Sequence, residues 1–196
     1  MNLDLFLQIW GGTGYLLAKI LLAIAEGKED GRRLRIFGWL SYLLGIPAWV
    51  IILASKNDWA FASNDIGSIP AMILGIITAW RGNKQVNKKY DRFVKIFTVF
   101  MIIIGITYSI YHFHGITTIS QVLEILVIIG FLGGSYLLAK KNLNGWLLFA
   151  AMCVCVVILM SLQGKVILAV LQGIAFIVTI LGYIRAKRKL LTPPKG

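Results

Sequence analysis

Seven long apolar segments alternate along the chain with short polar or basic stretches. A transmembrane helix needs about 20 mainly apolar residues, because the hydrocarbon core of a bilayer is about 30 Å thick. Continuous helices also satisfy their own backbone hydrogen bonds, which hydrocarbon cannot do for them. The pattern therefore predicts an all-α membrane protein with seven transmembrane helices. They are expected at residues 5–25, 36–54, 59–80, 93–113, 119–139, 143–162 and 166–184.

The composition supports a membrane protein and excludes several other classes. Hydrophobic residues make up 58% of the chain and charged residues 14%, and the mean hydropathy is +0.80. About a quarter of the residues of a soluble domain are charged, so a soluble enzyme, a disordered chain and a secreted disulfide scaffold are excluded. The 20 Lys and Arg residues, against 8 Asp and Glu, lie between the apolar runs rather than on one face. We therefore expect the lipid bilayer as a partner, and no nucleic acid.

The positive charges follow every second span and set the predicted orientation. Clusters of Lys and Arg follow the first, third, fifth and seventh spans, whereas the opposite side has Lys56 and Lys165. In membrane proteins the cytoplasmic loops carry the excess of Lys and Arg. The N-terminus is therefore expected outside and the C-terminus in the cytoplasm. Lys19, near the end of the first span, is expected to extend its amine to the cytoplasmic interface.

Short sequence matches indicate a duplication. Tyr-Leu-Leu-Ala-Lys occurs at residues 15–19 and again at 136–140, and Gly-Trp-Leu occurs at 38–40 and again at 145–147. A repeat of three transmembrane helices ends on the opposite side of the membrane from its start. A second copy can run in the same direction only if a fourth helix returns the chain to the first side. The prediction is a 3+1+3 parallel repeat like that of SWEET transporters. Its parts are residues 1–81 as the first repeat, 82–117 as a basic segment with a connector helix, and 118–196 as the second repeat with a basic tail.

The same residues resemble a known family. The segment 137–149, the pair Leu171-Gln172 and the segment 182–185 before the basic tail are similar to the PnuC-type vitamin transporters, and Gly38-Trp39 extends the likeness to the front half. This resemblance implies a SWEET-like fold in the bacterial inner membrane and facilitated uptake of a solute such as nicotinamide riboside. It also implies that the third helix packs between the first and second, and the seventh between the fifth and sixth. Similarity in outline to YgjV-type proteins leaves a structural or assembly role as the alternative.

Polar residues inside predicted spans are candidates for a binding site, because burying them in a membrane is costly. The third span contains Asn64 and Asp65 ahead of Pro70, unless this stretch is an outer loop that precedes a shorter helix. Gln172 lies about 10 Å into the seventh span. Trp49 lies deep in the second span, where it either stacks on a planar ligand or packs in the core.

Three further residues are weaker candidates for the site. Gln121 and Glu124 share a helical face near the outer end of the fifth span, where they line a mouth or cap the helix. Trp146 is at an interface by position, and the resemblance alone brings it into the site. The chain contains no metalloprotease, hydrolase or phosphate-binding-loop motif. We expect no catalytic activity, no cofactor and no metal site.

The predicted charge around the outer half of the molecule suggests a preference among solutes. Four acids lie there (Asp4, Asp58, Asp65 and Glu124) against two cations. This balance predicts a site for a neutral or weakly cationic solute and a bias against phosphorylated ones. We expect the site between the repeats near mid-depth, where a planar uncharged ring would stack and accept a few amide hydrogen bonds. A homo-oligomer is compatible with the sequence.

Overall fold

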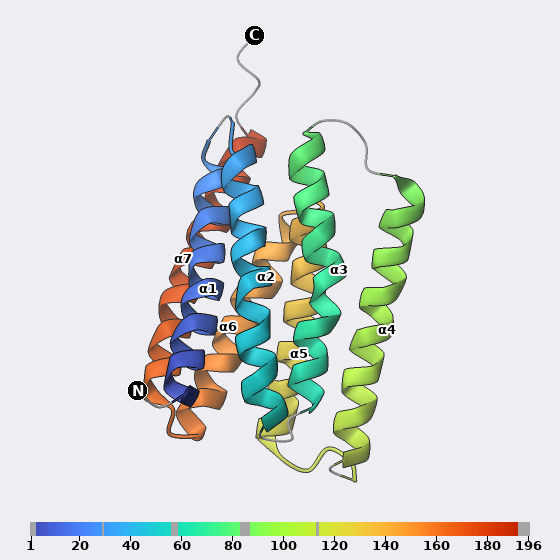
Figure 1. Cartoon of the computed structure of the whole chain (residues 1–196), viewed down its shortest axis with the longest axis vertical. Helices are drawn as coiled ribbons and strands as arrows, with labels where there is room; N and C mark the ends of the chain where they lie inside the picture. The colour runs from blue at the N-terminus through green and yellow to red at the C-terminus, as the bar shows by residue number, and fades with distance from the viewer. Residues whose placement is uncertain (1–2, 29, 56–58, 83–86, 113, 192–196) are drawn as a thin grey trace.

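The computed structural model describes residues 3–28, 30–55, 59–82, 87–112 and 114–191, and these residues form a bundle of seven helices (Figure 1). All seven are long and apolar enough to cross a membrane. The prediction of an all-α protein with seven transmembrane helices is therefore confirmed. The helices are α1 (Leu3–Glu26), α2 (Arg32–Ser55), α3 (Trp59–Arg81), α4 (Lys88–His112), α5 (Ile119–Ala139), α6 (Asn144–Leu162) and α7 (Val166–Leu191).

The helix ends differ from the predicted spans chiefly where basic residues flank an apolar run. Helices α2 and α4 begin at Arg32 and Lys88, and α7 continues to Leu191. Lys and Arg have good helix propensity, so a helix extends through them beyond either end of the apolar stretch. Helix α3 begins at Trp59 and contains Pro70 within it. The alternative of an outer loop in this region is therefore wrong.

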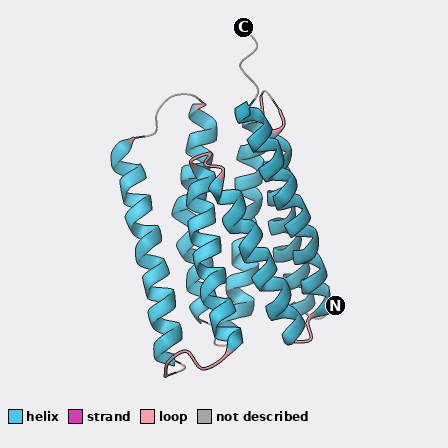
Figure 2. Ribbon diagram, turned by 180° about the vertical axis from the view of Figure 1, so that it is seen from behind, coloured by secondary structure: helices cyan, strands magenta, loops and turns pink. Residues whose placement is uncertain are grey.

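The contacts among six helices close into a ring, and α4 packs outside it (Figures 1 and 2). Around the ring the contacts run from α1 to α2, α3, α5, α6, α7 and back to α1. Helix α4 packs against α3 and α5. The interior of the ring is therefore shared by both sets of three helices, and α4 contributes no wall to it.

The predicted order of helices within each set is wrong. Helix α2 lies between α1 and α3, and α6 lies between α5 and α7. The connections from α1 to α2 and from α5 to α6 are short, and short connections favour antiparallel neighbours in contact. Small residues allow close packing there: a Cβ atom added to Gly14 of α1 would lie 3.3 Å from the Gly45 Cα of α2. In α5 and α6, a Cβ atom on Gly134 would lie 3.4 Å from the carbonyl oxygen of Gly145.

Two tryptophans occupy matching positions in the two sets of helices. The indole of Trp39 lies against Gly75 of α3, and the indole of Trp146 lies against Gly182 of α7. A shift of 107 residues carries the first pair onto the second. A duplication predicts such matched contacts, and helices α1 and α5, which begin the two sets, run in the same direction (Figure 1). The 3+1+3 repeat and its division of the chain into three parts stay predictions.

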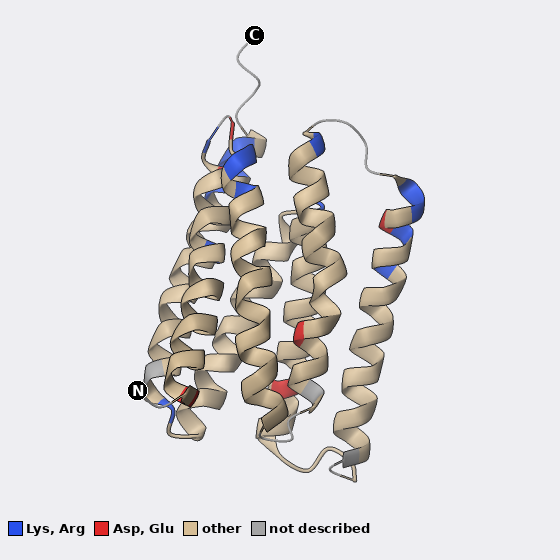
Figure 3. Cartoon of the chain, viewed as in Figure 1, with Lys and Arg blue, Asp and Glu red and all other residues tan. Residues whose placement is uncertain are grey.

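Lys and Arg gather at one end of the bundle, as Figure 3 shows. They lie in the connection from α1 to α2, at the end of α3, at the start of α4 and along the end of α7. Glu26 and Arg35 form an ion pair of 2.7 Å at this end, and the guanidinium of Arg185 donates to the Ala23 carbonyl oxygen at 3.2 Å. We refer to it as the cationic end. Its contacts join α1 to α7 and to the start of α2.

The positive-inside rule predicts that the cationic end faces the cytoplasm. A reporter fused after Lys141, in the connection from α5 to α6, should therefore read as cytoplasmic. A reporter fused at His114, in the connection from α4 to α5, should read as external. Alkaline phosphatase and fluorescent-protein fusions measure the two sides. A cytoplasmic signal at His114 would contradict the predicted orientation.

Candidate functional site

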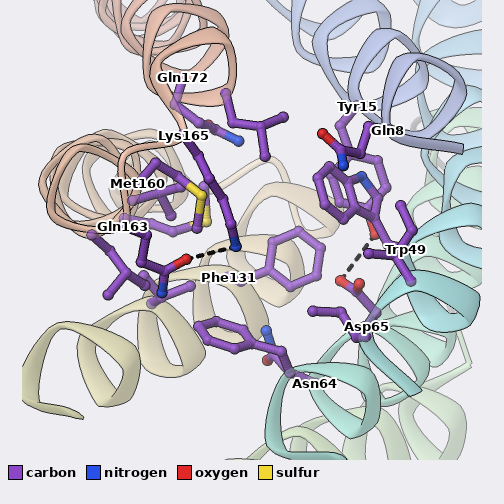
Figure 4. A pocket seen from close by; sticks show the side chains of 18 of the residues that line it. Gln8, Tyr15, Trp49, Asn64, Asp65, Phe131, Met160, Gln163, Lys165 and Gln172 are labelled. Atoms are coloured by element: carbon purple, nitrogen blue, oxygen red, sulfur yellow. Dashed lines mark hydrogen bonds between the residues drawn. The ribbon is translucent and has the colours of Figure 1, made fainter. Parts of the chain in front are cut away.

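A cavity of about 170 Å³ lies between the two sets of helices. Helices α1, α2, α3, α5, α6 and α7 all contribute to its walls, and most of the lining is apolar. In Figure 4, labelled side chains of α1, α2 and α3 face those of α6 and α7 across it. The polar lining residues are Gln8, Tyr15, Lys19, Trp49, Asn64, Asp65, Gln163, Lys165 and Gln172.

Aromatic rings form one side of the cavity. Tyr15 of α1 and Phe131 of α5 stack at a centroid distance of 5.8 Å, and Phe131 stacks in turn on Phe149 at 6.1 Å. Tyr42 packs edge-on against Tyr15 at 5.1 Å. Offset and edge-to-face packing of this kind is favourable beyond the area that it buries. The rings join the two sets of helices, and Tyr15 and Phe131 among them line the cavity.

A hydrogen bond crosses the ring of helices between α1 and α3. The Tyr15 hydroxyl donates to Oδ1 of Asp65 at 3.0 Å, as the dashed line in Figure 4 shows. Asp65 is 7% exposed, and Pro70 follows it in the same helix. A buried carboxylate is costly without such a donor. Tyr15 thus stabilises the carboxylate in the cavity wall.

Lys19 lies in the interior of the bundle with 2% of its surface exposed. Its ammonium lies 3.3 Å from Sγ of Cys153 and 3.4 Å from Oε1 of Gln172, and 5.9 Å from the centre of the Phe149 ring. Side chains on a helix tilt toward its N-terminus, which in α1 is away from the cationic end. The prediction that Lys19 extends to the cytoplasmic interface is therefore wrong. Its amine lines the cavity instead.

Two buried polar atoms at the cavity have no hydrogen-bond partner within the described part of the chain. They are the Oδ1 atom of Asn64 and the Nε1 atom of Trp49. An unpaired buried donor or acceptor costs about 1–3 kcal/mol. Both residues line the cavity, but the Nε1 edge of the Trp49 indole lies against Gly11 of α1. Of the two, Asn64 is therefore the better candidate to pair with a ligand, as an acceptor.

Exposed or half-buried polar residues mark the rim at the end opposite the cationic one. Lys165 donates to Oε1 of Gln163 at 2.7 Å, and both lie in the connection from α6 to α7 (Figure 4). Across the rim, Gln8 donates to Oδ2 of Asp4 at 2.6 Å. The cavity is thus reached from the end that the orientation prediction assigns to the outside.

The structure brings together four of the seven residues that the sequence proposed for the site. Trp49, Asn64, Asp65 and Gln172 line one cavity. A shift of 107 residues carries Asp65 onto Gln172, so they occupy matching positions in α3 and α7. Their assignment to a binding site stays a proposal, for which the shared cavity is the support.

The other three residues lie outside this cavity. Gln121 is 1% exposed, and its amide donates to the carbonyl oxygens of Ser109 and Gly115, which ties the start of α5 to the end of α4. Glu124 is half-buried one turn further along α5. Trp146 is buried in the core against Gly182 rather than at an interface, and it lines a second cavity at the cationic end.

The charge of the cavity differs from the balance that the sequence suggested. Its lining contains Lys19, Lys165 and Asp65. Lys56 and Asp58, which entered the predicted balance, lie outside the described residues. The sequence analysis missed Lys19 and Tyr15 as lining residues, although both belong to the repeated motif at residues 15–19. The signal was an ionisable residue within an apolar span, which is by itself a reason to suspect function.

Comparison with known proteins identifies one family. The model of a family described as nicotinamide mononucleotide transporter matches residues 31–188, which is most of the chain. The match includes the cavity residues of α2, α3, α5, α6 and α7, whereas α1 lies before its start. No curated protein and no solved structure matches the chain.

Proposed function

Because the chain belongs to the nicotinamide mononucleotide transporter family, we propose that its central cavity binds a vitamin-like solute built as nicotinamide riboside is, from a planar ring and a sugar. The protein is a membrane transporter of a small vitamin-like solute. We further propose that the protein takes up this solute into the cell by facilitated diffusion across a bacterial inner membrane.

The unpaired acceptor of Asn64 is the observation that carries the assignment of the site. It lies in an aromatic cavity between the two sets of helices, where SWEET-like transporters place their substrate. A carboxamide or sugar hydroxyl donates to such an acceptor. The rings of Tyr15 and Phe131 provide a stacking surface for the planar part.

The ionisable groups of the lining support the proposal of facilitated diffusion. A proton or sodium relay needs carboxylates near mid-depth. Of the residues that line the cavity, Asp65 alone is acidic, and its Oδ1 atom accepts from Tyr15. Alternating access is then a movement of the two sets of helices about the site. The Tyr15–Asp65 hydrogen bond joins α1 to α3 within the first set, so we expect it to be kept during that movement.

Uptake by purified protein tests the proposal. Liposomes that contain the protein should take up labelled nicotinamide riboside at least tenfold faster than empty liposomes. The rate should saturate with solute, and a protonophore should not change it. Absence of uptake with this and related vitamins would contradict the proposal. It would favour the alternative, a structural or assembly role of the YgjV type.

A further inference from the structure

The second cavity, of about 200 Å³, lies at the cationic end and shares no lining residue with the central one. Helix α6 has 19 residues, whereas α7, which packs against it, has 26. The connection from α5 to α6 therefore lies deeper in the bundle than the end of α7 (Figures 1 and 2). Lys141, Asn142 and Trp146 line the cavity from this connection and the start of α6, and Lys189 lines it from the end of α7. The end of α1 contributes Glu26.

Among the described residues, the two ammonium groups at this cavity have no carboxylate partner. Lys141 donates to the Gly82 carbonyl oxygen at 3.4 Å, and Lys189 donates to the Lys28 carbonyl oxygen at 3.0 Å. Both acceptors are neutral. Hydrogen bonds from an ammonium to an ionised acceptor are shorter and stronger than those to a neutral one. An anion in the cavity would therefore improve the pairing of both lysines.

The charges around Lys141 also favour an added anion. Glu26, the acid of the lining, is already engaged in its ion pair with Arg35. Burial and the positive charges of Arg35 and Lys189 lower the pKa of Lys141, while Glu26 acts in the opposite direction. A nearby like charge disfavours the charged form of a group, and a nearby opposite charge favours it. A negative group between Lys141 and Lys189 thus counteracts the repulsion between them.

The indole of Trp146 adds a neutral donor to the two cations. Trp146 is 1% exposed, and its Nε1 atom has no hydrogen-bond partner in the described part of the chain. A Cβ atom on Gly182 would lie 2.7 Å from Cη2 and Cζ3 of this ring, so Nε1 is on the edge that faces away from Gly182. In the first set the ring is turned the other way, and the Nε1 edge of Trp39 lies against Gly75. The donor of Trp146 is therefore not directed at the glycine of α7.

An exposed apolar face of α6 leads to the cavity from the side of the lipid. Leu147, Val154 and Ile158 are exposed, and their spacings of seven and four residues place them on one face of the helix. Leu143, four residues before Leu147, lines the cavity. Of the seven helices, α5 and α7 pack against α6, so this face borders the lipid. An acyl chain along it places its headgroup at the connection from α5 to α6.

We propose that the second cavity binds the phosphate group of an anionic membrane lipid, held by the ammonium groups of Lys141 and Lys189. The indole N–H of Trp146 is a third donor to the phosphate oxygens. Basic pockets between transmembrane helices on the cytoplasmic side suit such headgroups, and the predicted orientation places the cationic end on that side. The site is separate from the central cavity, so the proposal goes beyond the proposed transport function and does not depend on the solute.

Native mass spectrometry of the purified full chain tests the site, because it counts the lipids that stay bound and requires no transport. The protein in detergent is titrated with phosphatidylglycerol, which is anionic, and with phosphatidylcholine, whose phosphate is balanced by a choline ammonium. The wild type should bind one molecule of phosphatidylglycerol at least tenfold more tightly than phosphatidylcholine. Lys141→Gln and Lys189→Gln should each weaken the binding of phosphatidylglycerol at least threefold, and the double variant should lose the preference.

Lys187→Gln is the matched control. Lys187 is exposed near the end of α7, as Lys189 is, but it does not line the cavity. Removal of its charge should leave the affinity for phosphatidylglycerol close to that of the wild type. An equal loss in Lys187→Gln and Lys189→Gln would overturn the proposal, because the lipid would then respond to the charge of the whole cationic end. Equal affinity of the wild type for the two lipids would overturn it as well.

Inorganic phosphate separates a lipid headgroup from a soluble ligand. It has the charged oxygens of the headgroup but no acyl chain to lie along α6. It should therefore displace phosphatidylglycerol from the wild type only at concentrations far above that of the lipid. If inorganic phosphate bound more tightly than phosphatidylglycerol, and Lys141→Gln abolished its binding, the cavity would hold a soluble phosphate and the assignment to a lipid would be wrong.

Discussion

Replacement of Asn64 by leucine should lower the rate of solute uptake at least tenfold and leave the protein at least as stable as the wild type. The Asn64 side chain is buried, and its Oδ1 atom has no hydrogen-bond partner within the described chain. Leucine of similar size removes this unpaired acceptor, which itself costs about 1–3 kcal/mol. In this variant the hydrogen-bond donor of the solute no longer has the Asn64 acceptor and stays unpaired in an apolar site. About 1.4 kcal/mol of lost binding corresponds to a factor of ten.

Ser109→Ala provides the matched control for this prediction. The Ser109 hydroxyl is also buried and has no hydrogen-bond partner among the residues that the structure describes, but Ser109 lies in α4, outside the cavity. Its removal should leave uptake unchanged and keep or raise the thermal stability in detergent. Both variants are compared by uptake into liposomes and by thermal unfolding. Normal uptake by Asn64→Leu would mean that the site lies elsewhere in the molecule.

The sequence predicted the fold class because lipid imposes a simple rule on backbone hydrogen bonds. Apolar length alone identifies a helix in a membrane, and all seven predicted spans are helices in the structure. The order of the helices within each set was not predictable in this way. It depends on small residues such as Gly14 and Gly45, which allow α1 and α2 to approach closely. Apolar periodicity does not reveal which neighbour a glycine faces.

The site was predicted in part, for a reason that separates Asp65 from Lys19. Asp65 and Gln172 stood out because polar groups are rare inside spans. Lys19 is equally polar, but a long flexible chain near a helix end offered it a route to water. Only the packing of α1 against Phe149 and Cys153 shows that the Lys19 amine lies in the interior and not at the interface. Because Gln172 offers its oxygen to Lys19, Gln172→Leu would disturb that buried charge as well as the binding of a solute.

Gly75→Ala should prevent accumulation of folded protein or lower its melting temperature strongly. A Cβ atom on Gly75 would overlap with Cε2 and Nε1 of the Trp39 indole. Trp39 is buried between α2 and α3, so the ring has little freedom to move. Overpacking of a core usually costs about 1–3 kcal/mol, and occasionally more. A loss of this size is a large part of the total stability of a protein. Thermal unfolding in detergent measures it.

Gly173→Ala is the matched control for the glycine, because a Cβ atom there meets no other atom within 4 Å. It should raise stability by up to about 1 kcal/mol through helix propensity. Trp39→Leu creates space in which the alanine at residue 75 fits. In a double-mutant cycle, Gly75→Ala should therefore cost at least 1 kcal/mol less in the Trp39→Leu background, which is the usual size of coupling between residues in contact (about 0.5–3 kcal/mol). Equal costs in both backgrounds would show that the Trp39 indole does not enforce glycine at residue 75.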